Sequence, residues 1–364
     1  MRFVPLFTSL FAIAVLSGVL AACSPSAPAP GEPVAWTMAV TGDTVLSRRV
    51  ERDTFEARDY THAFGDLVPF MKSIDVFMTN LECQISDRGE PMDKGEARPF
   101  HFRAHPLMVN ALKETGIDIV TVANNHGMDY GWDALLQTID LCRRAGITVV
   151  GGGRNAVEAA APGFVEGGGN RILFIGFQAT ATQLGAGPFT PGVNAARHEE
   201  SDHFVRLAKN ALEAVDEPYD LAMITIHWGP NYRTQPTDKQ RDIARRLIDA
   251  GYDGVLCHSA HQFLGVELHQ GKPIIHDAGN FICDFLPVEP HWNDRNIVFV
   301  LHYDGTDLQR IECVPIFREG QITNHAEPLV AQQIAGRFMH MCNALGTETA
   351  INEEGRVVIE VGSP

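Results

Sequence analysis

Short apolar runs alternate with amphipathic stretches along most of this chain. Apolar runs bounded by polar or glycine residues predict strands, and apolar positions spaced three and four apart predict helices. Strands are expected at residues 36–41, 75–79, 117–123, 147–150, 171–177, 221–226, 255–256 and 273–275. Helices are expected between them, at residues 63–72, 106–115, 134–145, 155–161, 203–214 and 237–250. Strands that alternate with helices are typical of an α/β fold.

The pattern changes near the end of the chain. Residues 296–303 and 308–315 are two strand-like runs joined by Asp304-Gly305, which predicts an antiparallel hairpin. A last helix is expected at residues 329–345. Residues 178–197 contain Gly and Pro throughout and show no periodicity, so they are a candidate lid or substrate loop. Alternation followed by a hairpin predicts an α/β fold with one mixed sheet or two packed sheets.

Polar side chains follow many of the predicted strands at the point where each strand ends. They are Asp43, Asn80 and Glu82, Asn125 and His126, His227, His258 and His261, and His276 with Asp277. Because a rigid sheet presents side chains at its carboxyl edge, we expect these groups to share one site. Their residue types favour a metal or phosphate site.

The length and charge of the chain narrow its function. A chain of 364 residues has room for one large or two modest domains. Its formal net charge of −16 argues against a nucleic-acid partner, since binding phosphates requires exposed Lys and Arg. A bound metal could still create a positive site inside the protein.

The amino terminus is predicted to be a targeting segment. A basic start and an apolar run up to Leu20 precede small residues and Cys23, which is typical of an export signal. An uncleaved membrane anchor is the alternative, because the run is near the lower length limit for spanning. The residues before and including Cys23 resemble the bacterial lipobox. We therefore expect residues 1–23 to be a lipoprotein signal, Cys23 to be lipidated, and the protein to lie on the extracytoplasmic face of a membrane.

A tether and one main domain are expected after Cys23. Residues 24–35 are rich in Pro, Ala and Ser and are typical of a tether. We expect a main domain at residues 36–320 and a C-terminal helix and tail at residues 321–364. The six cysteines beyond Cys23 lie scattered in apolar contexts without a C-x-x-C pair, which favours buried free thiols. Export would also permit disulfides, and a ligand role stays open for Cys83, Cys257 and Cys283.

The polar groups at the strand ends suit a divalent metal. Carboxylates combined with several imidazoles favour Zn²⁺, Mn²⁺ or Fe, and an Asn amide can complete the set of ligands. Such an ion can lower the pKa of bound water and polarise a phosphoryl oxygen. Any single His or Asn has a structural alternative, in which it hydrogen-bonds the loop backbone. The order of the groups along the chain, each following a strand, favours the metal site.

That order resembles the blocks of the calcineurin-like metallophosphoesterases, and more closely a branch of that fold, the capsule-synthesis protein CapA family. Between residues 41 and 284, the matching pieces are Gly42-Asp43 with Arg48, Asn80-Leu81-Glu82, Phe102-Arg103, Asn124-Asn125-His126 with Asp129, His227-Trp228-Gly229 with Tyr232, His258 with His261, and Gly279-Asn280-Phe281 with Asp284. The resemblance implies two packed mixed β-sheets flanked by helices. It also implies a role in making or exporting poly-γ-glutamate.

The resemblance implies roles for individual residues. One or two divalent ions would be held by Asp43, Glu82, Asn125, His227, His258 and His261. His126 would protonate the leaving group, and Arg48 would clamp an anionic group. Asn280 would contact substrate or orient a ligand. The chain departs from the metallophosphoesterase pattern at Val45, where the Asp-x-His block carries its His, and in the H-x-x-H spacing of its last block.

Three functions follow from these observations. The first is a lipid-anchored protein of capsule or poly-γ-glutamate production, with poly-γ-glutamate synthetase subunits as partners. The second is an extracytoplasmic metal-dependent phosphoesterase, with an anionic polymer or a phosphate ester as substrate. The third is a binding or scaffold protein that keeps the fold without the chemistry. Metal content and a phosphoesterase screen separate the third from the second.

Overall fold

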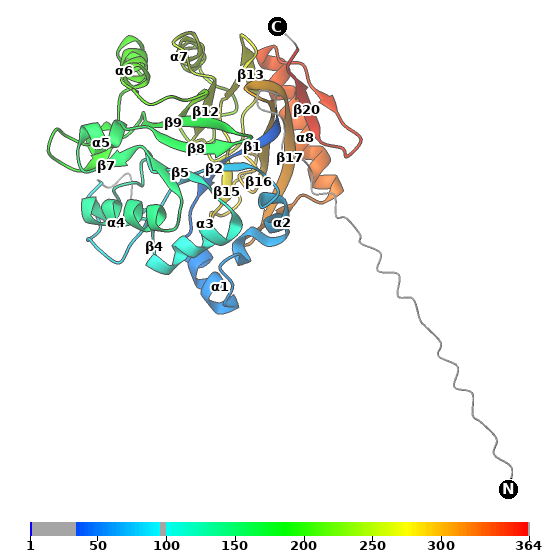
Figure 1. Ribbon diagram of the computed structural model, residues 1–364, viewed down its shortest axis with the longest axis horizontal. Helices are drawn as coiled ribbons and strands as arrows, with labels where there is room; N and C mark the ends of the chain where they lie inside the picture. Colours follow the sequence, from blue (N-terminus) through cyan, green and yellow to red (C-terminus); the bar gives the residue numbers. More distant parts are fainter. Residues whose placement is uncertain (2–33, 95–99, 363–364) are drawn as a thin grey trace. The chain divides into compact units, whose positions relative to one another are not determined.

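The computed structural model describes Met1 and residues 34–94 and 100–362 of the chain (Figure 1). Residues 34–94 and 100–362 belong to one compact unit. The predicted lipobox at Cys23 and almost all of the predicted tether lie outside the described residues. Among the residues that are described, no helix combines the length and apolar character needed to cross a membrane.

The larger of the two main sheets has ten strands and is mixed. Its main order is β19-β20-β17-β16-β1-β2-β5-β6, with β15 paired to β1 and β18 to β17. Strands β1, β2, β5, β6 and β15 run parallel, whereas β16 and β17 form the predicted antiparallel hairpin. The bounds are β1 Ala35–Thr44, β2 Val76–Leu81, β5 Ile119–Thr121, β6 Thr148–Val150, β15 Asn280–Ile282, β16 Arg295–Asp304, β17 Asp307–Glu319, β18 Ile322–His325, β19 Ala350–Ile351 and β20 Val357–Glu360.

The smaller main sheet has six strands in the order β13-β14-β12-β11-β9-β8. Its four central strands are parallel, and an antiparallel strand lies at each edge. The bounds are β8 Gly163–Gly167, β9 Asn170–Gln178, β11 Leu221–His227, β12 Gly254–His258, β13 Val266–His269 and β14 Lys272–Ile275. Two further two-stranded ladders join β3 Gln84–Ile85 to β4 Arg103–Ala104, and β7 Gly152–Gly153 to β10 Gly192–Val193.

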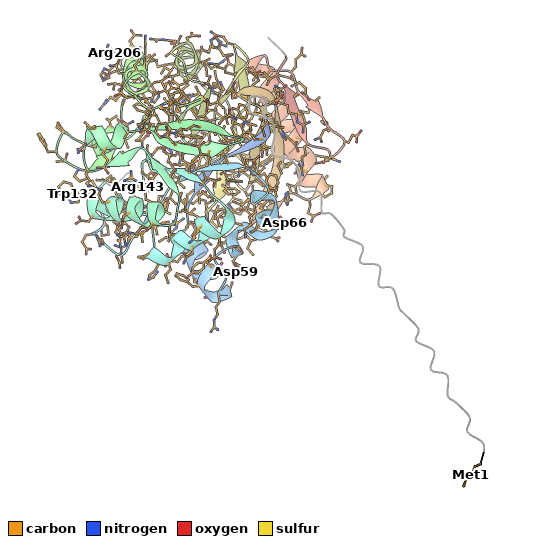
Figure 2. The ribbon with its side chains drawn as sticks, in the orientation of Figure 1. Met1, Asp59, Asp66, Trp132, Arg143 and Arg206 are labelled. Carbon is orange, nitrogen blue, oxygen red and sulfur yellow. The ribbon has the colours of Figure 1, made fainter. Side chains whose placement is uncertain are left out.

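Helices cover the outer faces of both main sheets (Figure 1). The α-helices are α1 Arg49–Ala57, α2 Val68–Met71, α3 Val109–Thr115, α4 Gly131–Arg144, α5 Ala156–Ala160, α6 Ser201–Glu213, α7 Asp238–Asp249 and α8 Pro328–Leu345. Short 3₁₀ turns lie at His62–Leu67, Pro106–Met108 and Thr182–Leu184. Charged side chains such as Arg143 of α4 and Arg206 of α6 lie at the periphery (Figure 2).

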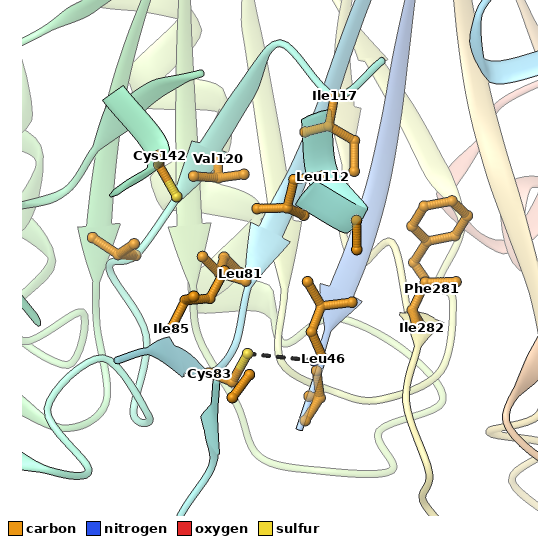
Figure 3. Packing of buried hydrophobic residues seen from close by; sticks show 14 of the residues in the cluster. Leu46, Leu81, Cys83, Ile85, Leu112, Ile117, Val120, Cys142, Phe281 and Ile282 are labelled. Atoms are coloured by element: carbon orange, nitrogen blue, oxygen red, sulfur yellow. Dashed lines mark hydrogen bonds between the residues drawn. The ribbon is translucent and has the colours of Figure 1, made fainter. Parts of the chain in front are cut away.

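Alternation of side chains along the strands builds three buried layers. Met38 and Val40 of β1 pack between the sheets, together with Phe174 of β9 and Met223 of β11. Other strand residues face outward onto helices α1–α4 or onto α6 and α7. Figure 3 shows the layer beneath α3 and α4, where the backbone N–H of Leu46 donates to Cys83 Sγ over 3.3 Å. All six described cysteines are buried free thiols, as expected from their apolar surroundings.

The fold class is confirmed: two mixed sheets pack against each other and are flanked by helices. The helix expected at residues 63–72 is interrupted, because Gly65 has φ +47° and breaks the helical path within the 3₁₀ segment His62–Leu67, so that α2 covers only Val68–Met71. A Cβ at Gly65 would lie 2.0 Å from Asn324 Oδ1, so this position requires glycine. The last helix, α8, packs on the layer between the sheets, where Phe338 contacts Phe263 and Phe299.

Candidate metal centre

The carboxyl ends of strands from both sheets meet at one place. In the larger sheet, Asp43 of β1 pairs in register with Asn80 of β2 and with Asn280 of β15. In the smaller sheet, His227 of β11 pairs with His258 of β12. Asn80 Nδ2 lies 3.5 Å from His227 Nδ1, which places the two strand ends in contact. These strand-end side chains therefore lie together, whereas His276, which was expected in the same site, contacts Glu267 at 3.1 Å instead.

Two glycines allow the strands to approach this closely. The backbone N–H of Asp43 donates to the carbonyl of Gly279 over 2.8 Å. A Cβ on Gly42 would lie 1.9 Å from that carbonyl oxygen, so no larger residue fits there. Gly279 itself has φ +67°, a conformation that favours glycine. The Gly-Asp and Gly-Asn pairs of the sequence thus bring Asp43 and Asn280 side by side.

Five of the six predicted metal ligands form one buried cluster. Two overlapping groups, Asp43–His227–His258 and Asp43–Glu82–His261, each have ligand atoms within 4.8 Å of one another. His261 Nδ1 lies 2.9 Å from Asp43 Oδ2, and His227 Nδ1 lies 2.8 Å from His258 Nδ1. His227 Nε2 lies 3.7 Å from Glu82 Oε1. Asp43 belongs to both groups, so it is the residue that could contact two ions at once.

Several oxygens of this cluster are buried without a hydrogen-bond partner. Among the described residues, none donates a hydrogen bond to Asp43 Oδ2, to either carboxylate oxygen of Glu82, or to Asn125 Oδ1. The 2.9 Å contact of His261 with Asp43 is close but lacks hydrogen-bond geometry. Burying a carboxylate without a partner is costly, and a bound cation removes that cost. The unpaired carboxylate oxygens therefore fit a divalent cation, and Asn125 Oδ1 is buried without a partner in the same way.

Burial also sets the protonation of the imidazoles. Burial lowers the pKa of His258 to about 3. It lowers the pKa of His227 well below the usual value, and the neighbouring His258 acts in the same direction. Burial, followed by the charge of Asp43, raises the pKa of Glu82 well above its usual value. Neutral imidazole is the form that binds metals, so the two histidines are ready to act as ligands. A divalent ion would in turn favour the ionised form of Glu82.

A layer of asparagines orients the cluster. Asn80 Nδ2 donates to Asp43 Oδ1 over 2.8 Å, and Asn124 Nδ2 donates to Asn80 Oδ1 over 2.9 Å. Asn280 Oδ1 lies 3.1 Å from His261 Nδ1, and its Nδ2 donates to the backbone of the same residue. Asn280 is buried, so the structure places it behind a predicted ligand. Sequence reasoning missed the role of Asn124, although it directly precedes Asn125.

His126 lies beside the cluster in a separate network. Its Nδ1 is 2.7 Å from Asp129 Oδ2, and Lys94 forms an ion pair with the other oxygen of Asp129. The His126 ring stacks on Phe102 with centroids 4.1 Å apart. Burial lowers the pKa of His126, although Asp129 acts in the opposite direction. With Nδ1 facing Asp129, Nε2 is the nitrogen left for a substrate. Sequence reasoning missed Lys94, which lies in a polar loop.

A cavity of about 1130 Å³ opens onto the cluster. Asn125, His126 and His261 lie in its wall. Four cationic residues also line it, Arg48, Arg49, Lys94 and Arg233, against two carboxylates, Glu199 and Asp284. Arg48 is held by an ion pair with Asp284. The wall is therefore locally positive in a chain whose net charge is −16, which favours an anionic ligand.

Comparison with known proteins identifies the family. The sequence model described as "Bacterial capsule synthesis protein PGA_cap" matches residues 37–285. The chain belongs to this family. The resemblance to the capsule-synthesis protein CapA family is thereby confirmed. The matched PGA_cap segment contains the whole buried cluster, from Asp43 to His261.

Relatives of the PGA_cap protein include a "Probable polyglutamine synthesis accessory protein" of Mycobacterium tuberculosis. It is 30% identical over 292 residues, which cover 77% of this chain and 76% of the relative. The "PGA biosynthesis protein CapA" of Bacillus subtilis is 27% identical over 245 residues, covering 67% of this chain and 62% of that protein. The "Capsule biosynthesis protein CapA" of Bacillus anthracis is 24% identical, covering 68% of this chain and 60% of that protein.

Solved structures from Thermus thermophilus show a more distant similarity. A hypothetical protein is 14% identical with a TM-score of 0.47, covering 78% of this chain and all of that one. A 5′-nucleotidase precursor is 12% identical with a TM-score of 0.44, covering 87% of this chain and 61% of that chain.

Proposed function

We propose that this PGA_cap family member is a metal-dependent phosphoesterase-type hydrolase that acts in capsule or poly-γ-glutamate production. The observation that carries the proposal is the buried cluster around Asp43. Asp43 Oδ2 and both carboxylate oxygens of Glu82 lack hydrogen-bond partners, burial lowers the pKa of His227 and His258, and a cationic cavity reaches the cluster at His261. If the cluster had only a structural role, these oxygens would be buried without a hydrogen bond or a cation to offset the free-energy cost of burial.

The proposed chemistry divides between the cluster and the cavity. One or two divalent ions, Mn²⁺, Zn²⁺ or Fe, would be held by Asp43, Glu82, Asn125, His227, His258 and His261. A bound ion would supply Lewis-acid polarisation of the phosphoryl group and a water of lowered pKa. Arg48 contributes a fixed guanidinium for the anionic group, because Asp284 holds it in place. In its protonated form, which Asp129 at Nδ1 favours, His126 would give its Nε2 proton to the departing oxygen and be left as the neutral imidazole.

The proposed setting follows the targeting segment and the names of the relatives. Lipidation at Cys23 would hold the protein on the extracytoplasmic face of a membrane, where a capsule polymer is assembled or released. Relatives named for poly-γ-glutamate and capsule biosynthesis support an anionic polymer or a phosphate ester as the substrate class. Poly-γ-glutamate synthetase subunits are the proposed partners.

The test pairs metal analysis with hydrolysis on the purified full chain. We expect one or two equivalents of Mn, Zn or Fe per chain, and metal-dependent hydrolysis of p-nitrophenyl phosphate that a chelator abolishes. The double variant His258→Ala/His261→Ala should lose both. His269→Ala is the matched control, because His269 lies on β13 and contacts Asp249 instead of the cluster. Full metal content in the double variant would overturn the assignment of the ligands.

One observation favours a binding role as the second candidate. Val45 stands where metallophosphoesterases carry a ligating His, and it is fully buried among apolar side chains. Thr44 Oγ1, next to it, is 2.7 Å from Thr79 Oγ1. Neither residue offers a ligand atom, which favours one ion over two. Binding of an anionic polymer without hydrolysis of any phosphate ester would support this candidate.

A further inference from the structure

We infer that the substrate of this site carries an apolar group next to its anionic group, as an aryl phosphate or a long-chain alkyl or prenyl phosphate does. The inference rests on the proposed function and specifies its substrate class. It follows from the composition of the cavity wall, from the distance of that wall to the cluster, and from the size of the cavity.

The cavity wall is cationic in one part and apolar in another. The apolar part contains Phe100, Phe102, Tyr232, Phe285, Leu286 and Val288. Phe100 is 60% exposed and Leu286 is 70% exposed. Exposed apolar side chains gathered at one cavity mark a binding surface, since each gains free energy when a ligand covers it. A small polar ester would leave them in water.

The apolar wall begins directly beside the predicted reaction centre. Phe102 stacks on His126, and the guanidinium carbon of Arg48 lies 4.5 Å from the centre of the Phe102 ring. The Phe285 ring is 5.1 Å from the His261 ring and 5.7 Å from the Phe102 ring. Phe102 itself is buried beneath Arg48 and His126, so the half-buried ring of Phe285 is the aromatic surface within reach of the ester substituent of a phosphoryl group bound there. The apolar part of the substrate must lie close to the phosphorus atom.

The wall is also fixed in place. Asp284, which directly precedes Phe285, forms ion pairs with Arg48 and with Arg49, the latter at 3.3 Å. Tyr232 stacks on His291 with centroids 4.9 Å apart. Surfaces held in this way lose little entropy when they bind a ligand, so they favour specificity for the shape that fills them. The cationic and apolar parts of the wall are thereby kept side by side.

The size of the cavity favours a substrate larger than a small ester. A volume of about 1130 Å³ lies just above the roughly 300–1,000 Å³ typical of small-molecule sites. A phosphate group with a methyl or glycerol substituent would leave most of it filled with water. An aromatic ring or a chain of about ten carbons occupies the space along Phe285, Leu286 and Val288. Each methylene buried there strengthens binding roughly fourfold.

The experiment compares esters of primary alcohols, whose leaving groups have similar basicity, so that the apolar group is the main difference. Hydrolysis of methyl, glycerol, 2-phenylethyl and decyl phosphate is measured with the metal-loaded full chain, at concentrations where decyl phosphate is monomeric. We expect kcat/KM to be at least about 100-fold higher for 2-phenylethyl or decyl phosphate than for methyl phosphate. Comparison of 2-phenylethyl with decyl phosphate decides between an aromatic and a long-chain substrate. Equal values for all four esters would overturn the inference and leave the proposed function standing.

Matched variants test whether the wall causes the preference. Leu286→Ser should lower the ratio of decyl to methyl kcat/KM roughly tenfold. Leu329→Ser is the control, because Leu329 is 69% exposed on α8 and does not line the cavity, so the ratio should stay unchanged. An unchanged ratio in Leu286→Ser would contradict the inference.

A binding measurement separates failure of the inference from failure of the proposed function. Methyl and decyl phosphonate cannot be hydrolysed and share the same anionic group, so the ratio of their dissociation constants reports the contribution of the apolar wall. Tighter binding of decyl phosphonate by the wild type, reduced in Leu286→Ser, supports the apolar substrate even if no ester is turned over. In that case only the proposed hydrolysis fails. Equal binding of both phosphonates overturns the inference, whatever the activity.

Discussion

Asp43 is the residue on which the candidate centre depends most, because it belongs to both groups of ligand atoms. One of its oxygens accepts a hydrogen bond from Asn80, and the other has none from a described residue. The neighbouring residues have the same two kinds of role: some position other side chains, and others offer atoms to a ligand. Asn124 and Asn280 hold other side chains in place, whereas Glu82, Asn125 and His126 present atoms that a bound ion or substrate can use.

His126 is the residue whose substitution best separates chemistry from structure. His126→Asn should lower turnover by roughly 10²–10⁴-fold, since proton transfer by a positioned side chain contributes that much. Metal content should stay unchanged, because His126 belongs to neither group of ligand atoms. Turnover, metal content and melting are measured on the same preparation. His203→Asn on the outer helix α6 is the control.

If His126→Asn lowers the melting temperature but leaves turnover unchanged, His126 has only a packing role. Its ring stacks on Phe102 and contacts Asp129, so loss of these contacts alone would lower the melting temperature. Unchanged turnover per folded molecule would contradict the proton-transfer role.

At the scale of secondary-structure elements, the close approach of β1 and β15 forms the centre. Gly42→Ala should destabilise the protein by about 3 kcal/mol or more, because the added Cβ would lie 1.9 Å from the carbonyl oxygen of Gly279. Metal binding should weaken as well, since Asp43 follows directly. Gly336→Ala is the matched control in α8, where the added Cβ meets nothing within 4 Å. It should stabilise the protein by about 0.5–1 kcal/mol.

Denaturant unfolding measures both variants. A Gly42→Ala protein as stable as the wild type would show that β1 and β15 can separate without cost. The described strand approach would then not be needed for the fold.

Another element-scale contact gives stability a dependence on pH. His302 on β16, 3.3 Å away, and the ion pair with Arg356 lower the pKa of Glu312 on β17 to about 2. The ionised carboxylate therefore stabilises the folded state above the unfolded pKa of about 4.5. That contribution is lost as the pH falls from about 4.5 toward 2.

Glu312→Gln should destabilise the protein at pH 7 by about 1.5–3 kcal/mol, the range for hydrogen bonds to charged groups. Unfolding free energies of the wild type and the variant should converge as the pH falls below about 4. A difference that is constant from pH 7 to pH 3 would exclude the ionised carboxylate as its source. Glu319→Gln, at the exposed end of β17, is the control.

The strands that carry the ligands could be predicted from the sequence because their signals are local. In β1, β11 and β12 an apolar run ends at the candidate ligand, so the pattern singles out Asp43, His227 and His258 as polar groups at strand ends. Helix α1 gives no such signal, since only Val50 and Thr54 of its nine residues are buried. The edge strands β8 and β13 were missed for the same reason, because both contain partly exposed positions.

The site itself was predictable only in part. The resemblance to a family supplied the ligand types in order along the chain. The ion pair of Lys94 with Asp129 joins residues of two different loops. The hydrophobic periodicity of the sequence does not predict which loops lie in contact. The apolar wall could not be predicted from the sequence either, because Phe102, Tyr232 and Phe285 come from segments far apart in the chain. Tertiary structure alone brings them to one cavity.

At the scale of the whole molecule, the negative net charge determines what kind of membrane anchor the protein would need. A net charge of −16 repels an anionic membrane surface, so electrostatic attraction cannot hold this protein there. The cationic cavity is a local exception that attracts anionic ligands to the centre. An apolar substrate group of the kind inferred above would be most available at a membrane. Association with a membrane would therefore require an apolar anchor, which is the role proposed for a lipid on Cys23.

Cys23→Ser should release the protein from the membrane fraction or leave it unprocessed. One acyl chain gives only marginal anchoring, whereas the several chains of a bacterial lipoprotein hold a protein firmly. The measurement is fractionation of cells that express the full chain, together with incorporation of a labelled fatty acid. Ser26→Ala, three residues away, should keep both the label and the membrane location. A Cys23→Ser protein that remains in the membrane fraction after a high-salt wash, with unchanged electrophoretic mobility, would rule out the lipid anchor, because the wash removes weak electrostatic attachment.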